Sequence, residues 1–131
     1  MTRIEFHVVA CGDASARLHY ARDWLGALGP GARAHVCCDP DAQRELRETL
    51  APQHPQVTVL DAGSAVPRPD TRTVLINLAT DVPAFFSRYR CTLDIADKRG
   101  ASVEADRSRY RFYRDRGYPI TLHQIDALEV A

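Results

Sequence analysis

The alternation of short apolar runs with stretches of helical periodicity constrains the fold of this chain more than any other feature. In the first half, the strand-like runs are residues 3–10, 34–38 and 57–60. Between them, apolar side chains recur at steps of three and four residues over 16–28 and again after Pro40. This order predicts an α/β fold with a mostly parallel central sheet and helices on both faces. A chain of 131 residues suits a single domain over residues 1–131.

The second half continues the pattern. Residues 73–78 are the most apolar run and are predicted to form a central strand, because a strand buried on both faces is hydrophobic throughout. Further strands are expected over residues 91–96 and 118–123. A strongly charged helix is predicted over residues 102–116, with Gly117 just past its last turn.

Composition and charge exclude several classes of protein. The 17 acidic residues balance the 17 basic ones, which argues against a general or sequence-specific nucleic-acid binder. No apolar run is long enough to span a bilayer, and the N-terminus lacks the apolar region of a signal peptide. The cysteines form no CxxC pair and are typical of free thiols in a reducing compartment: Cys11, Cys37, Cys38 and Cys91. We therefore expect a cytoplasmic protein without membrane contact.

The usual motifs for cofactors and catalysis are missing. Residues 11–16, after the first strand, read CGDASA, which fits neither GxGxxG nor GxxxxGK[ST]. The five histidines are scattered, without the HxxxH or HExxH spacing that places two metal ligands on one helical face. No GxSxG nucleophile motif occurs. The sequence predicts no cofactor, no metal site and no catalytic residue.

One enzymatic alternative stays open. Cys11 follows the first strand, near the carboxyl edge of the predicted sheet, where α/β enzymes place reactive groups. A small thiol-dependent or phosphate-handling enzyme could use Cys11 with a histidine, and Cys37 or Cys38 could belong to a redox pair. A low pKa and fast reaction of the Cys11 thiol would favour this alternative.

The densest chemical signal lies near the C-terminus. Residues 98–116 hold seven basic residues against three acidic ones, whereas the whole chain has no net charge. One face of the predicted helix carries residues at i, i+3, i+4 and i+7: Arg107, Tyr110, Arg111 and Arg114. Val103 extends this stripe by one turn. Three guanidinium groups around an aromatic ring predict a surface for a partner that is both acidic and hydrophobic.

Other interpretations of the stripe remain. A charged helix face is often only solvated, and Tyr110, Phe112 or Tyr113 could belong to the core. Phosphate would also suit the arginines. A direct single-stranded DNA binder would use the same aromatic and basic groups, and would show a steep salt dependence and indifference to an acidic peptide.

Four segments, in order along the chain, resemble one known family. They are RIEFHVV (3–9), HVCCDPDAQ (35–43), VLINLATDVPAFFSRY (74–89) and RSRYRFYRDRGY (107–118). Together they are similar to the chi subunit of bacterial DNA polymerase III. The two later segments, with the patterns FFxRY and RxRYxxYRxxGY, are the more specific.

The resemblance implies a non-catalytic accessory of the clamp-loader complex, with a Rossmann-like sheet that binds no nucleotide. Such proteins link the polymerase, through a small partner called psi, to the single-stranded DNA-binding protein. Their target on that protein is its acidic C-terminal tail, which ends in phenylalanine. Arg107 and Tyr110 match tail-contacting positions of the family, while helical geometry adds Arg111 and Arg114.

The sequence departs from the family pattern in two places. Better-known members have a lysine one turn before the arginine, where this chain has Val103, and Lys98 or Arg99 would have to compensate. Relatives also carry a tryptophan and a Phe-x-Pro-His-like run in a stretch that corresponds to residues 48–57. We expect this stretch to lie on the psi side, with Leu50 and Val57 as a smaller apolar patch, although core burial would explain both residues equally well.

Overall fold

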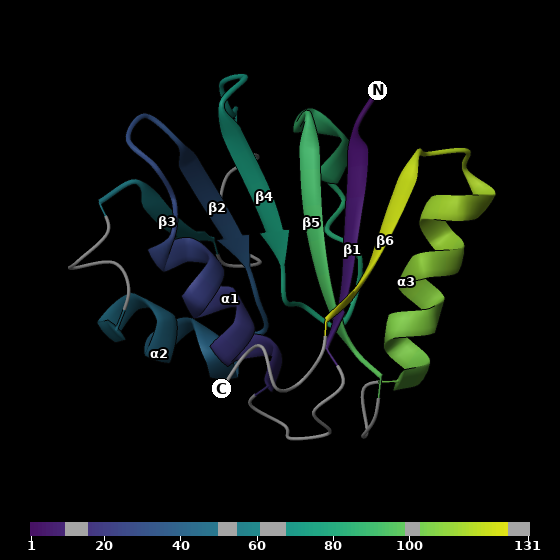
Figure 1. Cartoon of the computed structure of the whole chain (residues 1–131), viewed down its shortest axis with the longest axis horizontal. Coiled ribbons are helices and arrows are strands. Elements are labelled where there is room, and N and C mark those ends of the chain that lie inside the picture. The colour runs from purple at the N-terminus through teal and green to yellow at the C-terminus, as the bar shows by residue number, and fades with distance from the viewer. Residues whose placement is uncertain (10–15, 50–54, 61–67, 99–102, 126–131) are drawn as a thin grey trace.

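The computed structural model describes residues 1–9, 16–49, 55–60, 68–98 and 103–125. Within these ranges the strands are β1 (Arg3–Val9), β2 (Arg33–Cys37), β3 (Val57–Leu60), β4 (Thr73–Asn77), β5 (Cys91–Asp97) and β6 (Ile120–Ile125). They form one sheet in the order β3-β2-β4-β5-β1-β6, and every neighbouring pair is parallel (Figure 1). The predicted α/β fold is confirmed, and the described strands are more uniformly parallel than the sequence indicated.

Helices cover both faces of the sheet, as predicted. One core cluster joins Ala21 and Leu25 of α1 (Ala16–Gly26) and Leu46 of α2 (Pro40–Thr49) to one face. A second cluster joins Phe86 of the short 3₁₀ helix η1 (Phe86–Arg88) and Tyr113 of α3 (Val103–Asp115) to the other face. The strands of a parallel sheet carry apolar side chains on both faces, so helices have to cover each face of the sheet.

The predicted central strand is also confirmed. β4 lies between β2 and β5, and four of its five residues are buried. Because strands on both sides occupy its backbone groups, β4 exposes no edge to solvent. The edges of the sheet are β3 and β6.

Some element boundaries differ from the sequence predictions for local reasons. The first helix ends at Gly26 rather than residue 28, because the amides of Ala27 and Leu28 donate to carbonyls three residues back, in 3₁₀ fashion. The last strand begins at Ile120 rather than residue 118. Pro119 has no amide hydrogen to donate, although its carbonyl accepts from Ile4 over 2.9 Å. In the part of the chain that the structure describes, no helix has the length and hydropathy to span a membrane.

Candidate functional site: a basic groove beside helix α3

The C-terminal end of α3 is defined by a glycine. The Gly117 amide donates to the carbonyl of Arg114 over 3.0 Å, and the Tyr118 amide donates to the carbonyl of Tyr113 over 3.1 Å. Gly117 has φ +78°, a left-handed conformation that favours glycine. These two bonds satisfy carbonyls at the helix end and direct the chain back towards β6.

The face of α3 that packs on the sheet contains a buried ion cluster. Arg109 is 2% exposed and donates from Nε to both carboxylate oxygens of Asp94 on β5, each over 3.1 Å. It also bonds Asp106, one turn earlier on α3. Tyr113 donates its hydroxyl to Asp94 over 2.9 Å, and Asn77 of β4 donates its amide to the same carboxylate over 3.2 Å. Because an unpaired buried charge is strongly unfavourable, this cluster fixes which face of α3 meets the sheet.

Ionisation in this cluster follows from its contacts. Burial lowers the pKa of Arg109, but the Asp94 and Asp106 carboxylates outweigh that effect and raise the pKa overall. Burial raises the pKa of Tyr113, and the Asp94 carboxylate raises it further. Arg109 therefore stays charged and Tyr113 stays protonated near neutral pH, so the cluster has a structural character rather than an acid–base one.

The other side of α3 lines a groove of about 460 Å³, which we call the α3 groove. Its remaining walls come from β1, the end of β5 and the edge strand β6, beside which α3 lies in Figure 1. All the residues of the predicted stripe line it: Val103, Arg107, Tyr110, Arg111 and Arg114. The prediction that they share one face of a helix is confirmed.

Apolar side chains form part of the α3 groove. Phe6, Val8 and Ala96 come from the interior strands, and Leu122 comes from β6. The half-buried Tyr110 ring meets Phe6 edge-on, with centroids 5.3 Å apart at 84°. Leu122 is 49% exposed, so the groove offers uncovered apolar surface next to an aromatic ring.

Exposed cations surround this apolar surface. Lys98, Arg107 and Arg111 are exposed, and Arg114 forms a solvent-exposed pair with Asp115 over 3.1 Å. Within the described ranges, no hydrogen-bond or ion-pair partner occupies the Arg107 guanidinium. Two acidic residues, Asp97 and Asp106, also line the groove, but both are buried, and Asp106 is bonded to Arg109. The α3 groove thus presents positive charge to a ligand.

A larger hollow lies at the other end of the sheet and lacks this chemistry. It measures about 640 Å³, and its lining includes Leu28–Ala32, Pro55 and Gln56. Arg33 and His35 are its only basic side chains among the described residues. The α3 groove combines several cations with an apolar floor, and it is therefore the better candidate site despite its smaller volume.

The structure separates residues that the sequence analysis grouped together. Arg109 contributes to the basic character of residues 98–116, yet it is buried and neutralised. The floor residues Phe6 and Leu122 were missed, because they come from the strands β1 and β6, and only the strand order of the sheet brings them beside α3. The alternation of side chains between the two faces of β1 and β6 was the available signal. It identifies groove residues only when the position of α3 is known.

The residues considered for the psi side have a different environment. Val57 is 5% exposed and belongs to the core cluster under α1 and α2. Its neighbour Thr58 is exposed on the edge strand β3. Leu50 lies outside the described residues.

The described thiols are poorly suited to nucleophilic chemistry. Burial, with Asp39 nearby, raises the pKa of Cys37 to about 11. Burial also raises the pKa of Cys38 to about 11 and that of Cys91 above its ordinary value. These groups are protonated at neutral pH, whereas reactive cysteines are thiolates. Cys11 lies outside the described residues.

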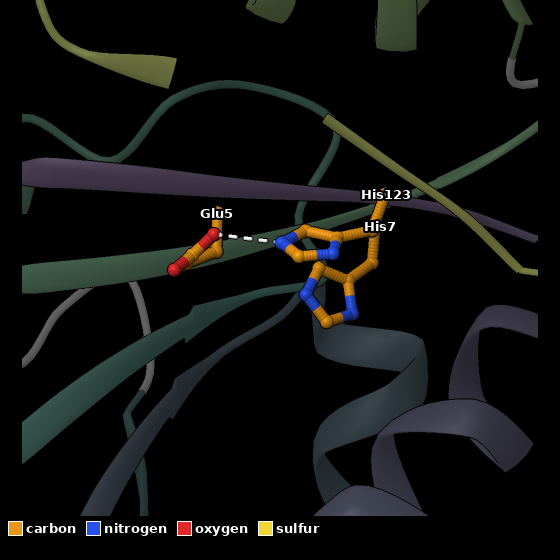
Figure 2. Close-up of side chains that lie close together, drawn as sticks. All are labelled: Glu5, His7 and His123. Atoms are coloured by element: carbon orange, nitrogen blue, oxygen red, sulfur yellow. Dashed lines mark hydrogen bonds and ion pairs between the residues drawn. The ribbon is translucent and has the colours of Figure 1, made fainter. Parts of the chain in front are cut away.

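Strand pairing in the sheet also brings His123 beside Glu5 and His7, from which it is far apart in the sequence. His7 of β1 and His123 of β6 are partners in the parallel register, and Glu5 precedes His7 by two residues on the same strand face. Figure 2 shows the two imidazoles against each other, with the Glu5 carboxylate facing His123. The ring centroids are 4.5 Å apart, and Glu5 Oε2 lies 2.9 Å from His123 Nε2. No short sequence motif signals this cluster, because strand pairing creates it.

Comparison with known proteins agrees with the geometry. The family model "DNA polymerase III chi subunit, HolC" matches residues 48–121, a segment that contains all of α3. The DNA polymerase III subunit chi of Pseudomonas aeruginosa is 29% identical to this chain, over 95% of this chain and 98% of that protein. The similarity to that protein therefore extends well beyond the segment that the family model matches, over nearly the whole chain. The chain belongs to the DNA polymerase III chi subunit family.

Proposed function

We propose that this protein is a non-catalytic accessory subunit of the DNA polymerase III holoenzyme. In this function it binds the acidic C-terminal tail of the single-stranded DNA-binding protein and links that protein to the clamp loader, through psi or another clamp-loader component. The α3 groove is the observation that carries the proposal, because it combines exposed cations with an apolar floor on one surface. Family membership supports the same function.

The groove suits the two ends of such a ligand. Arg107, Arg111 and Arg114 can each bond carboxylates through paired N–H groups, and charge-assisted bonds contribute about 1.5–3 kcal/mol each before opposing costs. The terminal phenylalanine would pack against Tyr110 and Leu122, where apolar burial contributes roughly 25 cal/mol per Å². Ordering a flexible tail opposes part of this gain, so we expect micromolar affinity that weakens as salt rises.

Lys98 has a specific part in this proposal. It is exposed and lines the α3 groove together with Val103, the position where better-known relatives have lysine. A cation is thus available near that turn from the segment after β5. We propose that Lys98 supplies the charge that Val103 lacks.

A peptide-binding experiment tests the tail proposal. Fluorescence anisotropy would compare a labelled acidic peptide ending in Asp-Phe with the same peptide amidated at its C-terminus. We expect micromolar binding of the free acid and weaker binding of the amide, because the amide removes the terminal carboxylate. Equal binding of both peptides would contradict carboxylate recognition, and no binding at low salt would contradict the tail proposal itself.

The same assay separates the alternative functions. Unlabelled single-stranded DNA should fail to displace the peptide, whereas a direct DNA binder would release it and show a steep salt slope. A thiol titration covers the enzymatic alternative, since a fast-reacting Cys11 would favour a thiol-dependent enzyme.

For the psi side, we propose the edge of the sheet around Val57, together with Leu50, which lies outside the described residues. Because Val57 is buried, exposed neighbours on the edge strand β3, such as Thr58, would make the contact. Thr58→Arg should weaken capture of psi and leave binding of the tail peptide unchanged. Unchanged capture would place psi elsewhere on the molecule.

A further inference from the structure

The Glu5–His7–His123 cluster has the composition and spacing of a metal site. One ligand atom from each side chain lies within 4.8 Å of those of the other two. In tetrahedral zinc sites, Zn–N distances of about 2.0–2.1 Å place neighbouring ligand atoms about 3.4 Å apart. Glu5 Oε2 and His123 Nε2 lie 2.9 Å apart, somewhat closer than this spacing, and the three ligand atoms all lie within 4.8 Å of one another, so modest side-chain rotations would bring all three donors to one ion.

Surrounding contacts orient the cluster. His7 Nδ1 lies 2.6 Å from the hydroxyl of Tyr20 on α1. This bond fixes one ring nitrogen and leaves Nε2 as the donor for a metal, in the way that outer hydrogen bonds orient metal-binding histidines. Burial lowers the pKa of His7 and the neighbouring His123 lowers it further, against a smaller opposing effect of Glu5. The neutral imidazole that metals bind is therefore the favoured form.

The two strands position the ligands with little freedom. Glu5 and His7 project from the same face of β1, and the pairing of β1 with β6 places His123 directly opposite His7. All three residues are half-buried, which leaves an approach from solvent. We propose that Glu5, His7 and His123 bind a divalent transition-metal ion, with Zn²⁺ as the best fit to two imidazoles and one carboxylate.

Such an ion would join the edge strand to its neighbour. β6 pairs with β1 alone among the described strands, and the proposed ligands lie on both. On the opposite face of β6, Leu122 and Gln124 flank His123 in sequence and line the α3 groove. The proposed ion would therefore hold the strand that forms part of the groove.

Metal binding is measured on tag-free protein, because a polyhistidine tag binds the same ions. Competition with a chromophoric chelator should give one Zn²⁺ per chain with micromolar or tighter affinity. We expect a loss of at least tenfold in affinity for His7→Gln, His123→Gln and Glu5→Gln. His19→Gln is the matched control, since His19 is exposed on α1 and should leave affinity unchanged.

Two further readouts separate this site from adventitious binding and from misfolding. Zn²⁺ should raise the melting temperature of the wild-type protein by several degrees and leave that of His123→Gln unchanged. Melting in chelator checks that each variant is folded. Co²⁺ in the site should give visible bands of tetrahedral intensity without the near-ultraviolet charge-transfer band of thiolate ligands.

Three results would overturn the proposal. They are the absence of Zn²⁺ binding at 100-fold excess over protein, equal affinity in wild type and His123→Gln, or a thiolate band with Co²⁺. The last result would assign the ion to the cysteines instead.

Discussion

The two faces of α3 use the same residue types for opposite purposes. Arg109 and Tyr113 point to the sheet, are almost fully buried and bond the same Asp94 carboxylate. Arg107 and Tyr110 lie on the groove face, where the arginine is exposed and the tyrosine is half-buried. The position of an arginine around the helix axis, rather than the residue type, thus decides whether it is buried in an ion cluster or exposed in the groove.

The largest effect should come from removing the buried guanidinium. Arg109→Met removes the guanidinium that bonds both Asp94 and Asp106 in the buried cluster, and we expect a loss of about 3–5 kcal/mol in the free energy of unfolding. Urea denaturation measures this loss. Arg107→Met is the matched control, and its exposed position predicts a change within about 0.5 kcal/mol.

Equal losses in the free energy of unfolding for Arg109→Met and Arg107→Met would contradict the distinction between the two faces of α3. If Arg109→Met fails to fold, the added change Asp94→Asn should restore part of the stability, because it removes one unpaired charge. Absence of any recovery would indicate that lost packing, and not charge, is responsible.

The two tyrosine hydroxyls give the next comparison. Tyr113→Phe removes the 2.9 Å bond to the buried Asp94, and we expect a loss of about 1–3 kcal/mol in the free energy of unfolding. Tyr110→Phe should change stability little, because the Tyr110 hydroxyl has no hydrogen bond within the described part of the chain. Thermal melting of both variants would test this comparison. A larger loss of stability for Tyr110→Phe than for Tyr113→Phe would contradict it.

Binding should respond in the opposite way. We expect Arg107→Ala and Tyr110→Ala to weaken binding of the acidic peptide at least tenfold, about 1.4 kcal/mol, while both variants remain folded. Arg44→Ala, an exposed arginine on α2 across the sheet, changes the net charge equally and should bind normally. Anisotropy and melting are read together. Normal binding by both groove variants would show that the ligand lies elsewhere.

The smallest effect concerns Lys98. Its exposed position predicts that Lys98→Ala weakens peptide binding only about two- to threefold, as expected for a solvated ion pair of 0.2–1 kcal/mol. Val103→Lys in the same background should restore the affinity, because it places a cation at the neighbouring position of the groove. Failure of both changes to alter affinity would exclude Lys98 and Val103 from the charge-reading part of the site.

Local patterns predicted much of this molecule. Hydrophobic periodicity located the described strands and helices, and helical spacing placed Arg107 and Tyr110 on one face before the fold was known. Spacing could not show that Arg109 is buried, since that depends on which face of α3 the sheet contacts. The pairing of His7 with His123 and the contribution of Leu122 to the groove depend on strand order, which no local pattern contains.

The position of β1 has a consequence for how the molecule assembles. This first strand pairs only with β5 and β6, and the contact between Glu5 and His123 spans 118 positions. During synthesis both edges of β1 therefore stay unpaired until most of the chain has been made. Such long-range strand pairing is slow, and unpaired strand edges are prone to aggregation. Because β1 and β6 together line the α3 groove, the proposed binding surface cannot form before β6 has been synthesised. A nascent or truncated chain would lack it, so recruitment through the groove would itself select for completed molecules.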